Sequence, residues 1–216
     1  MQSGLYRSID DLPPEIAVFP LPGAMLFPRW QLPLNIFEPR YLNMVDDAMH
    51  GTRLIGMVQT IGGDRTYPEI AAVGCVGRIT EFSETDDGRY LILLSGVCRF
   101  HVDAELEVKT PYRQVRAGWR PYAADLDPDT ADSGLDRGRL VAALRVYALD
   151  KGMNIDWKSV ENAPIEGLIN ALCASCPFNI MEKQALLEAP DLTDRAETLI
   201  ALLKMDMPGP DSDTLQ

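Results

Sequence analysis

Two cysteines in the stretch Cys173-Ala-Ser-Cys176 have the spacing of a redox site or of one half of a zinc site. The other half is missing, because the sequence has no second Cys-x-x-Cys and its two histidines, His50 and His101, lie in the first half of the chain. A reactive Cys-x-x-Cys opens a helix, where the dipole lowers the thiol pKa, whereas this pair falls in the last turn of a predicted helix. We therefore interpret the thiols as core groups, and we expect no metal ion and no cofactor.

The remaining polar residues do not form a catalytic pattern. Ser95-Gly96 lacks the Gly-x-Ser-x-Gly turn of a serine hydrolase. The acidic pairs at 46–47 and 86–87 fall on a predicted helix face and in a predicted turn, without the arrangement of two carboxylates that share acid–base work. We predict that the chain is not an enzyme and has no catalytic residue; the best candidate for an enzyme is the Cys173/Cys176 pair.

A mixture of rings and arginines precedes residue 125, and an RNA-binding surface uses such a mixture: Tyr112, Arg113, Arg116, Trp119, Arg120 and Tyr122. Two observations oppose that function. The 20 basic and 32 acidic side chains give a net charge of −12, which disfavours binding to phosphates and anionic lipid. The arginines also have acidic partners nearby at Asp125, Asp127 and Asp129. RNA or small-molecule binding is therefore the alternative function.

The composition is that of a globular protein, with 46% hydrophobic and 24% charged residues among 216. The longest uninterrupted apolar runs, 90–94 and 199–203, are far shorter than the roughly 20 residues of a membrane helix. The first eleven residues lack the apolar stretch of a signal peptide, and four cysteines are too few for a disulfide framework in this length. We expect a cytoplasmic protein.

Short β-branched and aromatic runs predict strands at residues 16–19, 32–37, 54–59, 74–82, 89–94 and 97–102. Gly96 predicts a bend or a bulge after the fifth run. In the sixth run, apolar residues alternate with Arg99, His101 and Asp103, which predicts one core face and one wet face. The first part of the chain is therefore rich in β-structure.

One helix interrupts these strands. Pro39 suits the first helical position, Glu38 places a negative charge at the positive end of the dipole, and Gly51 ends the helix. Apolar side chains at positions 41, 42, 45 and 49 form one stripe, so we expect this helix to pack on the sheet.

The apolar period changes from 2 to 3.6 after a connector that is rich in Asp. Gly152 closes a first predicted helix, Pro164 opens a second, Asn179 with Glu182 forms a capping box for a third, and Pro190 precedes the last. We predict an α+β chain with a β subdomain at 1–124, a connector at 125–134, a helical bundle at 135–207 and a flexible tail at 208–216.

Four stretches carry a resemblance to a known family. Phe19-Pro-Leu-Pro-Gly-Ala-Met-Leu-Phe-Pro28 and Leu34-Asn-Ile-Phe-Glu-Pro-Arg-Tyr41 resemble the opening of the Lon-protease N-terminal domain family. Gly74-Cys-Val-Gly-Arg-Ile-Thr80 and Leu93-Leu-Ser-Gly-Val-Cys-Arg-Phe100 are similar to two later strand motifs of that family, in the same order. The resemblance implies a PUA-like β pseudo-barrel with one inserted helix, followed by a C-terminal helical bundle.

The residues of these motifs also have physical roles in a small barrel. The prolines suit strand ends because they cannot donate to a ladder, the glycines permit close backbone approach, and Glu38 and Arg40 can fix a strand-to-helix corner by pairing. The structural motif consists of Pro22, Gly23, Phe27, Pro28, Phe37, Glu38, Pro39, Arg40, Tyr41, Gly74 and Gly77.

The resemblance implies a stand-alone, non-catalytic relative of the protease. No stretch reads Gly-x-x-x-x-Gly-Lys-Ser/Thr, and the chain that follows the bundle is too short for a peptidase domain. In the family's protease the corresponding domain helps to capture unfolded substrate. The resemblance therefore implies that this chain binds unfolded or apolar polypeptide segments, as an adaptor or chaperone-like factor in proteolysis or protein quality control, with the Lon protease or its substrates as partners.

We expect the peptide to bind in a groove between the barrel and the bundle. Methionine and aromatic side chains suit the promiscuous binding of apolar segments. The candidate binding residues are Met25, Phe27, Trp30 and Trp157.

Overall fold

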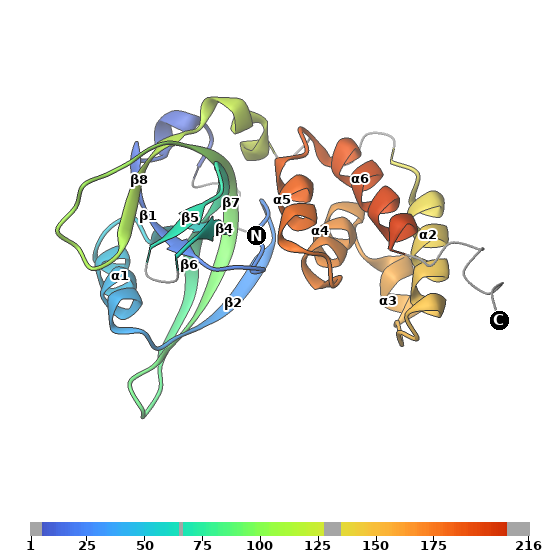
Figure 1. The fold of residues 1–216 in the computed structure, drawn as a ribbon, viewed down its shortest axis with the longest axis horizontal. Helices are drawn as coiled ribbons and strands as arrows, with labels where there is room; N and C mark the ends of the chain where they lie inside the picture. The colour runs from blue at the N-terminus through green and yellow to red at the C-terminus, as the bar shows by residue number, and fades with distance from the viewer. Residues whose placement is uncertain (1–5, 65–66, 128–134, 207–216) are drawn as a thin grey trace.

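The strand-like runs of the first part close into a small barrel, drawn at the left of Figure 1. The computed structural model describes residues 6–64, 67–127 and 135–206. Within these ranges the strands are β1 (Glu15–Pro20), β2 (Gln31–Ile36), β3 (Leu54–Val58), β4 (Thr60–Gly63), β5 (Pro68–Ile70), β6 (Val73–Glu84), β7 (Tyr90–Glu105) and β8 (Arg113–Gly118).

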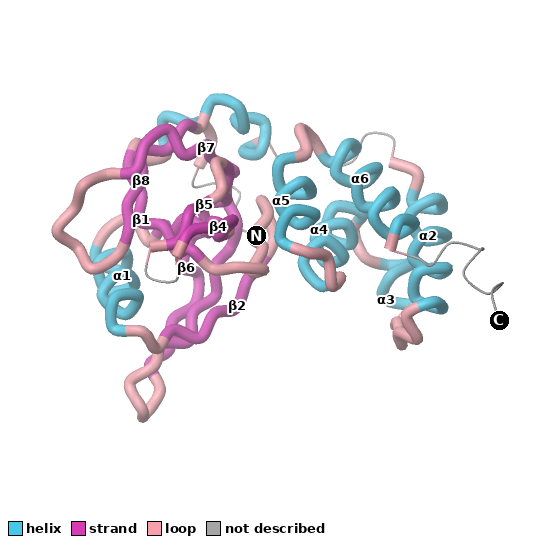
Figure 2. The backbone as a smooth tube through the Cα atoms, in the orientation of Figure 1, coloured by secondary structure: helices cyan, strands magenta, loops and turns pink. Residues whose placement is uncertain are grey.

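Helices form a second lobe at the right of Figure 1, and Figure 2 separates these cyan helices from the magenta strands of the barrel. The α+β class expected from the change of period is confirmed. None of the described helices combines the length and the hydropathy that a bilayer crossing requires. The helical segments are η1 (Ile9–Asp11), α1 (Pro39–His50), η2 (Arg120–Leu126), α2 (Arg137–Asp150), α3 (Trp157–Asn162), α4 (Ile165–Ser175), α5 (Ile180–Glu188) and α6 (Leu192–Met205).

Strand β7 organises the barrel, because different strands pair with its two halves. From Tyr90 to Ser95 it pairs with β2, and from His101 onward it pairs with β8. Strand β6 occupies the opposite edge from Tyr90 to His101. Since β8 also pairs with β1, and β1 pairs in parallel with β3, the ring of β7, β6, β3, β1 and β8 closes. Strand β2 is not part of the closed ring, and it pairs along one edge with β7.

Gly96 lies where β2 ends its pairing with β7. Its N–H donates to the carbonyl of Trp30 at 2.8 Å, and its carbonyl accepts from the N–H of Arg29 at 2.9 Å. A Cβ atom at this position would lie 1.9 Å from the backbone oxygen of Phe27. The register of β6 and β7 shifts next to the pair of Gly77 and Gly96, so the predicted bulge is confirmed. Glycine is required here because a loop crosses directly over the strand.

Gly74 and Gly77 on β6 permit similar close contacts, as predicted. A Cβ on Gly74 would lie 2.5 Å from the backbone oxygen of Met57, and one on Gly77 would lie 2.6 Å from Cδ2 of Leu26. The two glycines therefore let β3 and the loop before β2 pack tightly against β6.

Helix α1 begins and ends where the sequence predicts. Pro39 is its first residue and Gly51 follows its last. Met44, which is not part of the predicted stripe, is fully buried. The side chain of Glu38 makes no capping hydrogen bond and pairs with Arg40 at 2.8 Å. An ion pair therefore fixes the corner between β2 and α1.

Polar side chains cap four of the five described helices of the second lobe, and Pro164 precedes α4 without such a cap. Asn179 and Glu182 exchange two side-chain-to-backbone hydrogen bonds of 3.0 and 2.8 Å, so the predicted capping box of α5 is confirmed. Asp191 caps α6. Helix α3, capped by Asp156, was not predicted, because its six residues are too few to show a period.

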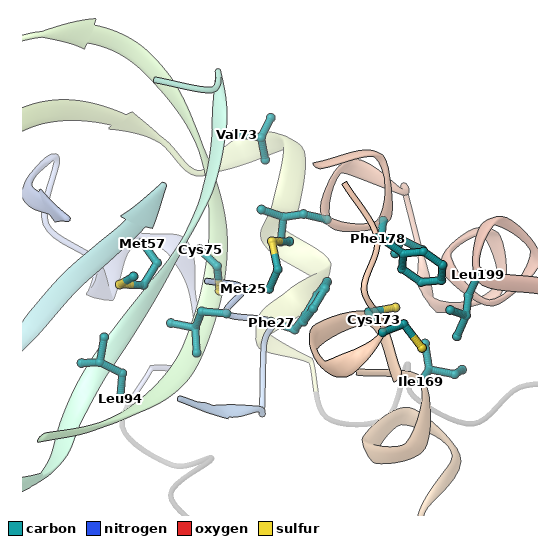
Figure 3. Packing of buried hydrophobic residues seen from close by; sticks show 14 of the residues in the cluster. Met25, Phe27, Met57, Val73, Cys75, Leu94, Ile169, Cys173, Phe178 and Leu199 are labelled. Carbon is teal, nitrogen blue, oxygen red and sulfur yellow. The ribbon is translucent and has the colours of Figure 1, made fainter. Parts of the chain in front are cut away.

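Two apolar clusters stabilise the lobes. The first fills the inside of the barrel and consists of Leu12, Ile16, Val18, Leu54, Val58, Val76, Cys98, Phe100, Val115, Ala117 and Trp119. The second begins on the outside of the barrel and continues without a break into the bundle (Figure 3). The two lobes therefore share one core.

Three features of the first part differ from the prediction. The runs 89–94 and 97–102 form one strand, because the bulge does not interrupt pairing. Strand β8 and the hairpin of β4 and β5 were not predicted, since their sequences lack a long alternating run. The helical segment η2 extends into the predicted connector as far as Leu126. Connector residues 128–134 and the predicted tail 208–216 lie outside the described residues.

Candidate functional site

The structure corrects the prediction of an open groove between the lobes. Met25 and Phe27, two candidate binding residues, lie at this junction with 3% and 0% of their surface exposed. Figure 3 shows the Phe27 ring beside the helix that carries Cys173. The guanidinium of Arg195 lies 4.7 Å from the centroid of the same ring. Side chains from both lobes therefore fill the space in which a peptide was expected.

The other two candidate residues lie apart from one another. Trp30 is half-buried at the end of the loop that carries Phe27, and its N–H donates to the Phe27 carbonyl at 3.1 Å. Trp157 is half-buried at the start of α3, with the Arg145 guanidinium 4.4 Å from its ring centroid. Since α4 and α5 lie between α3 and the barrel (Figure 1), the structure does not bring the four candidates to one surface.

Arg99 is buried, and its predicted place on a wet strand face is wrong. The guanidinium donates to the Asp125 carboxylate from Nε at 2.9 Å and from Nη2 at 2.8 Å, and the two residues are 3% and 7% exposed. It also donates to carbonyls at the end of α5, those of Leu187 at 3.1 Å, Ala189 and Pro190 at 3.1 Å. Arg99 therefore links the barrel to the bundle, a role that strand alternation cannot reveal.

A second guanidinium lies at the same helix end. Arg195 of α6 is 3% exposed and donates to the Leu186 carbonyl at 3.0 Å and to Oδ1 of Asn170 at 3.2 Å. Burial lowers the pKa of Arg195, and the charge of Arg99 lowers it further. Both cations lie at the C-terminal carbonyls of α5, which form the negative end of the helix dipole. The junction is therefore a structural centre in which protein acceptors hold both guanidinium groups.

Residues of the resemblance motifs surround an open cleft beside α1. The cleft has a volume of about 760 Å³ and lies among the end of β1, the first turn of α1, the β4–β5 hairpin and the segment before β8. Its lining is rich in rings and prolines: Phe19, Tyr41, Tyr67, Tyr112, Pro20, Pro22, Pro68 and Pro111. Sequence reasoning missed this site, because its walls come from four segments that are distant along the chain.

One wall of the cleft is built on α1. The rings of Phe19 and Tyr41 lie 4.2 Å apart between centroids, and the Arg40 guanidinium lies 4.6 Å from the Tyr41 centroid. Glu38 holds this guanidinium through the ion pair at the corner. Burial raises the pKa of Tyr41, so its phenol is protonated at neutral pH.

Another part of the lining, around Arg113, has the same combination of an arginine, a ring and a carboxylate. The Arg113 guanidinium lies 4.2 Å from the centroid of the Tyr67 ring and 2.6 Å from the Glu105 carboxylate. The hydrogen bond from Arg113 lowers the pKa of Glu105. Tyr112 donates to Oδ2 of Asp47 at 2.6 Å, and burial together with this carboxylate raises the pKa of Tyr112. Both arginines of the cleft are therefore held in place by a ring and a carboxylate.

The lining of the cleft has the residue types of a binding pocket. In residues 6–64, 67–127 and 135–206, no group of three or more His, Cys, Asp or Glu side chains is placed to hold a metal ion. Rings and prolines supply apolar contact area, and the arginines, phenols and backbone of the hairpin supply polar groups at the rim. This mixture is typical of small-ligand and peptide pockets.

The remaining motif residues lie in the loops around these elements. The N–H of Gly23, whose φ is +79°, donates to Oε1 of Gln59 at 2.8 Å. Pro28 is buried. Phe37 is 63% exposed and does not line the cleft.

The three rings of the expected RNA surface are buried or half-buried. Tyr112 and Trp119 are each 7% exposed, and the Trp119 indole donates to the carbonyl of Pro13 at 3.0 Å. Tyr122 is half-buried, with the Arg99 guanidinium 4.6 Å from its centroid. Trp119 and Tyr122 pack against the chain, and Tyr112 lines the cleft, so the three rings do not form one surface for stacking bases.

Two of the arginines in this cluster have partners other than those expected. Arg116 lies 3.6 Å from Glu15 across β8 and β1, and Arg113 has the partner described above. The predicted pairing with Asp125 is wrong, because this carboxylate binds the buried guanidinium of β7. Asp129 lies outside the described residues.

The Cys-x-x-Cys thiols are core groups. Cys173 lies in the last turn of α4 and Cys176 directly after it, and both are free and buried. Burial raises the pKa of Cys173 to about 12 and that of Cys176 to about 11. Cys75 and Cys98 are also free and buried, and burial raises their pKa values too. All four thiols are therefore protonated at neutral pH.

His101 lies on the exposed strand face that the sequence predicts, and His50 ends α1. His50 is the last residue of α1, and its Nδ1 lies 2.7 Å from the carbonyl of Asp46. His101 is exposed on β7, with its Nδ1 3.0 Å from Oδ1 of Asp103.

A family model described as the ATP-dependent protease La (LON) substrate-binding domain matches residues 15–205. The chain belongs to this LON family. The match extends from β1 through the end of α6, so it includes the cleft, the buried ion pair and the bundle. The family expected from the motifs is therefore confirmed for both lobes of the LON domain.

Curated relatives of this LON domain are much longer proteins. The Lon protease of Flavobacterium johnsoniae is 28% identical over 202 residues, which are 88% of this chain and 24% of the relative. Lon protease 2 of Sorangium cellulosum is 26% identical over 197 residues, 87% of this chain and 24% of the relative. The chain therefore spans about a quarter of the length of these relatives.

Solved structures show the same fold. A Lon N-terminal domain protein from Xanthomonas campestris has a TM-score of 0.62 and 23% identity, covering 90% of this chain and 99% of that one. The N-terminal domain of the Mycobacterium avium complex Lon protease has a TM-score of 0.62 and 13% identity, covering 89% and 100%. The arrangement of barrel and bundle is therefore shared with Lon N-terminal domains.

Proposed function

We propose that this LON domain is a non-catalytic binding module that holds short apolar segments of unfolded polypeptide in the cleft beside α1. The observation that carries the proposal is the lining of the cleft, which combines four rings and four prolines with positioned arginines at the rim. A volume of about 760 Å³ falls within the range of ligand pockets and accommodates several side chains.

The β4–β5 hairpin favours an extended peptide. Thr60, Gly62 and Gly63 of β4 line the cleft, and the two glycines leave the backbone uncovered by side chains. In the described residues β4 pairs with β5 alone, so its other edge has no strand neighbour. Backbone groups at such an edge can bind the main chain of a peptide, while pockets take alternate side chains.

The family supplies the class of partner. Its description names a substrate-binding domain, and the curated relatives are Lon proteases. We therefore propose protein substrates of a Lon protease, or the protease itself, as partners, and an adaptor or chaperone-like role in proteolysis.

Fluorescence anisotropy of a labelled, permanently unfolded polypeptide tests the proposal. We expect saturable binding without nucleotide that persists at high salt, because the contacts are mainly apolar. Tyr67→Ala is expected to weaken binding roughly tenfold, as loss of an aromatic contact costs about 1–2 kcal/mol. The side chain of Tyr67 is 58% exposed, so the variant retains the core.

Phe37→Ala is the matched control, because Phe37 is a similarly exposed ring outside the cleft. Its affinity is expected to equal that of the wild type. The proposal fails if the wild type shows no binding at high micromolar concentration, or if both variants lose affinity equally.

A further inference from the structure

The β4–β5 hairpin forms a wall of the cleft, yet it lies outside the six-stranded sheet of the barrel. Residues 61–63 of β4 are exposed, two of them are glycines, and the pairing with β5 shifts register between Thr60 and Gly62. Glycine weakens a strand, and a two-stranded hairpin by itself is at best marginally stable in water. Contacts with the barrel must therefore hold this wall in place.

The barrel holds the base of the hairpin. The N–H of Ala71 donates to the carbonyl of Gln59 at 2.9 Å, and Ile70 packs against the apolar cluster inside the barrel. Tyr67 and Pro68, which line the cleft, lie nearer to the turn of the hairpin than these contacts. These two residues have a separate connection to the barrel.

Glu105, the last residue of β7, is the centre of this connection. Its carboxylate accepts hydrogen bonds from Nε and Nη2 of Arg113, both at 2.6 Å, and from the phenol of Tyr67. The guanidinium that Glu105 orients also donates from Nη1 to the Pro68 carbonyl at 2.6 Å, and it packs on the Tyr67 ring. One carboxylate of the barrel therefore links both hairpin residues, either directly or through Arg113.

Glu105 itself does not line the cleft. The side chains of Arg113 and Glu105 are 14% and 28% exposed, so water screens their ion pair only in part, and hydrogen bonds between charged groups are about twice as strong as neutral ones. We propose that Glu105 is a positioning residue of the cleft: by holding Arg113 and Tyr67, it fixes the hairpin against the barrel and so raises the affinity of the cleft for polypeptide. The effect on affinity rests on the proposed function, whereas the order of the hairpin does not depend on it.

Amide hydrogen exchange of the full chain, followed by NMR spectroscopy, measures the order of the hairpin. Glu105→Ala is expected to accelerate the exchange of the β4 and β5 amides at least about tenfold, because charged hydrogen bonds to the hairpin are lost. The amides of β1 and β3 are expected to exchange as in the wild type. Glu107→Ala is the matched control, since Glu107 is an exposed carboxylate two residues further along that does not line the cleft.

Two further variants test whether the connection runs through these groups. Tyr67→Phe keeps the ring in the cleft and removes the hydrogen bond to Glu105, so hairpin exchange is expected to rise severalfold in the wild-type background and not to rise further in Glu105→Ala. Glu105→Gln keeps the shape and one acceptor oxygen, so an intermediate exchange rate is expected, and this variant replaces Glu105→Ala if circular dichroism shows that the alanine variant does not fold.

The anisotropy titration with unfolded polypeptide measures the effect on affinity. Glu105→Ala is expected to bind roughly fivefold more weakly, because binding must then order the hairpin, whereas Glu107→Ala is expected to bind as the wild type does.

Three results would overturn the proposal: hairpin exchange that Glu105→Ala leaves unchanged, equal acceleration in Glu107→Ala, or faster hairpin exchange with wild-type affinity for the polypeptide. A different result separates the two proposals. If the wild type binds no polypeptide while Glu105→Ala accelerates hairpin exchange, the proposed function fails and the positioning of the hairpin by Glu105 is supported.

Discussion

Arg99 and Asp125 form a two-point ion pair beneath the end of α5, with donor–acceptor distances of 2.9 and 2.8 Å. Strand β7 supplies the cation and η2 the anion, while carbonyls at the end of α5 accept the remaining guanidinium protons. The Asp125 carboxylate also accepts from the backbone N–H of Arg99 at 2.9 Å. These hydrogen bonds offset the desolvation of two buried charges, and they orient the bundle on the barrel.

We predict that Arg99→Met strongly destabilises the protein. The variant leaves the Asp125 carboxylate buried without its cation and removes the donors to the carbonyls of α5. Breaking a buried pair on one side lowers the free energy of unfolding by about 3–5 kcal/mol. Urea denaturation followed by circular dichroism measures this change.

Arg116→Met is the control for this variant. Arg116 also belongs to an ion pair of the barrel, but its side chain and that of Glu15 are 58% and 50% exposed, at 3.6 Å. We expect a change below about 1 kcal/mol, the upper value for exposed pairs. Equal losses in the two variants would contradict the role given to the buried pair.

Two glycine substitutions are predicted to change the free energy of unfolding in opposite directions. Gly96→Ala places a Cβ 1.9 Å from the backbone oxygen of Phe27, so either the loop or the strand must move, and we expect a loss of about 3 kcal/mol or more. Gly167→Ala meets no atom within 4 Å and lies inside α4, so we expect a gain of about 0.5–1 kcal/mol. Thermal and urea unfolding report both changes, and a stable Gly96→Ala variant would show that the loop crossing is not tight.

The sequence predicts those parts of the fold whose signals are local. Pro39 and Gly51 mark the ends of α1, and Asn179 with Glu182 marks the start of α5, because caps involve residues only a few positions apart. Strand β8 escapes prediction, since its arginines at 113 and 116 read as a surface cluster while its partners β1 and β7 are distant along the chain.

Prediction of the candidate sites is limited in the same way, because the sequence supplies only local signals. Met25 and Phe27 have the residue types of a peptide site, but burial by α4 and α6 depends on the position of the bundle, which no local pattern encodes. The cleft joins Tyr41, Tyr67 and Tyr112 from three segments, and only the closure of the barrel brings them together. The resemblance motifs nevertheless include Phe19, Arg40 and Tyr41 of the cleft lining, which link the sequence to the cleft.

Thiol chemistry is predicted to report unfolding. At pH 7.5 the four cysteines are protonated and buried, so a disulfide reagent should modify the native protein slowly and all four thiols rapidly in denaturant. Time courses of thiol release with and without urea measure this difference. Rapid modification of Cys173 and Cys176 in the native protein would contradict their assignment as core groups.

The same pKa values predict the alkaline limit of stability. Because folding raises the pKa of Cys173 from 9.0 to about 12 and of Cys176 from 9.0 to about 11, the unfolded chain loses these protons first as the pH rises. The contribution of these two protonated thiols to the free energy of unfolding is therefore fully present below pH 9. It is lost progressively as the pH rises above 9 and through 11 to 12. The urea midpoint should be the same at pH 7 and pH 9 and lower at pH 10.5. Cys173→Ala should make this decrease of the midpoint with pH smaller.

Phe27→Leu tests whether Phe27, at the junction of the lobes, is a core residue or a binding residue. Phe27 is completely buried and carries the Arg195 guanidinium on its ring, so the smaller side chain should lower the free energy of unfolding by about 1–2 kcal/mol. The cleft is lined by other residues, so the anisotropy titration with unfolded polypeptide should give the wild-type affinity. The opposite result would be a variant of unchanged stability that binds the polypeptide tenfold more weakly. It would show that the polypeptide binds at the junction, because the Phe27 ring can contact a ligand only if the two lobes separate there.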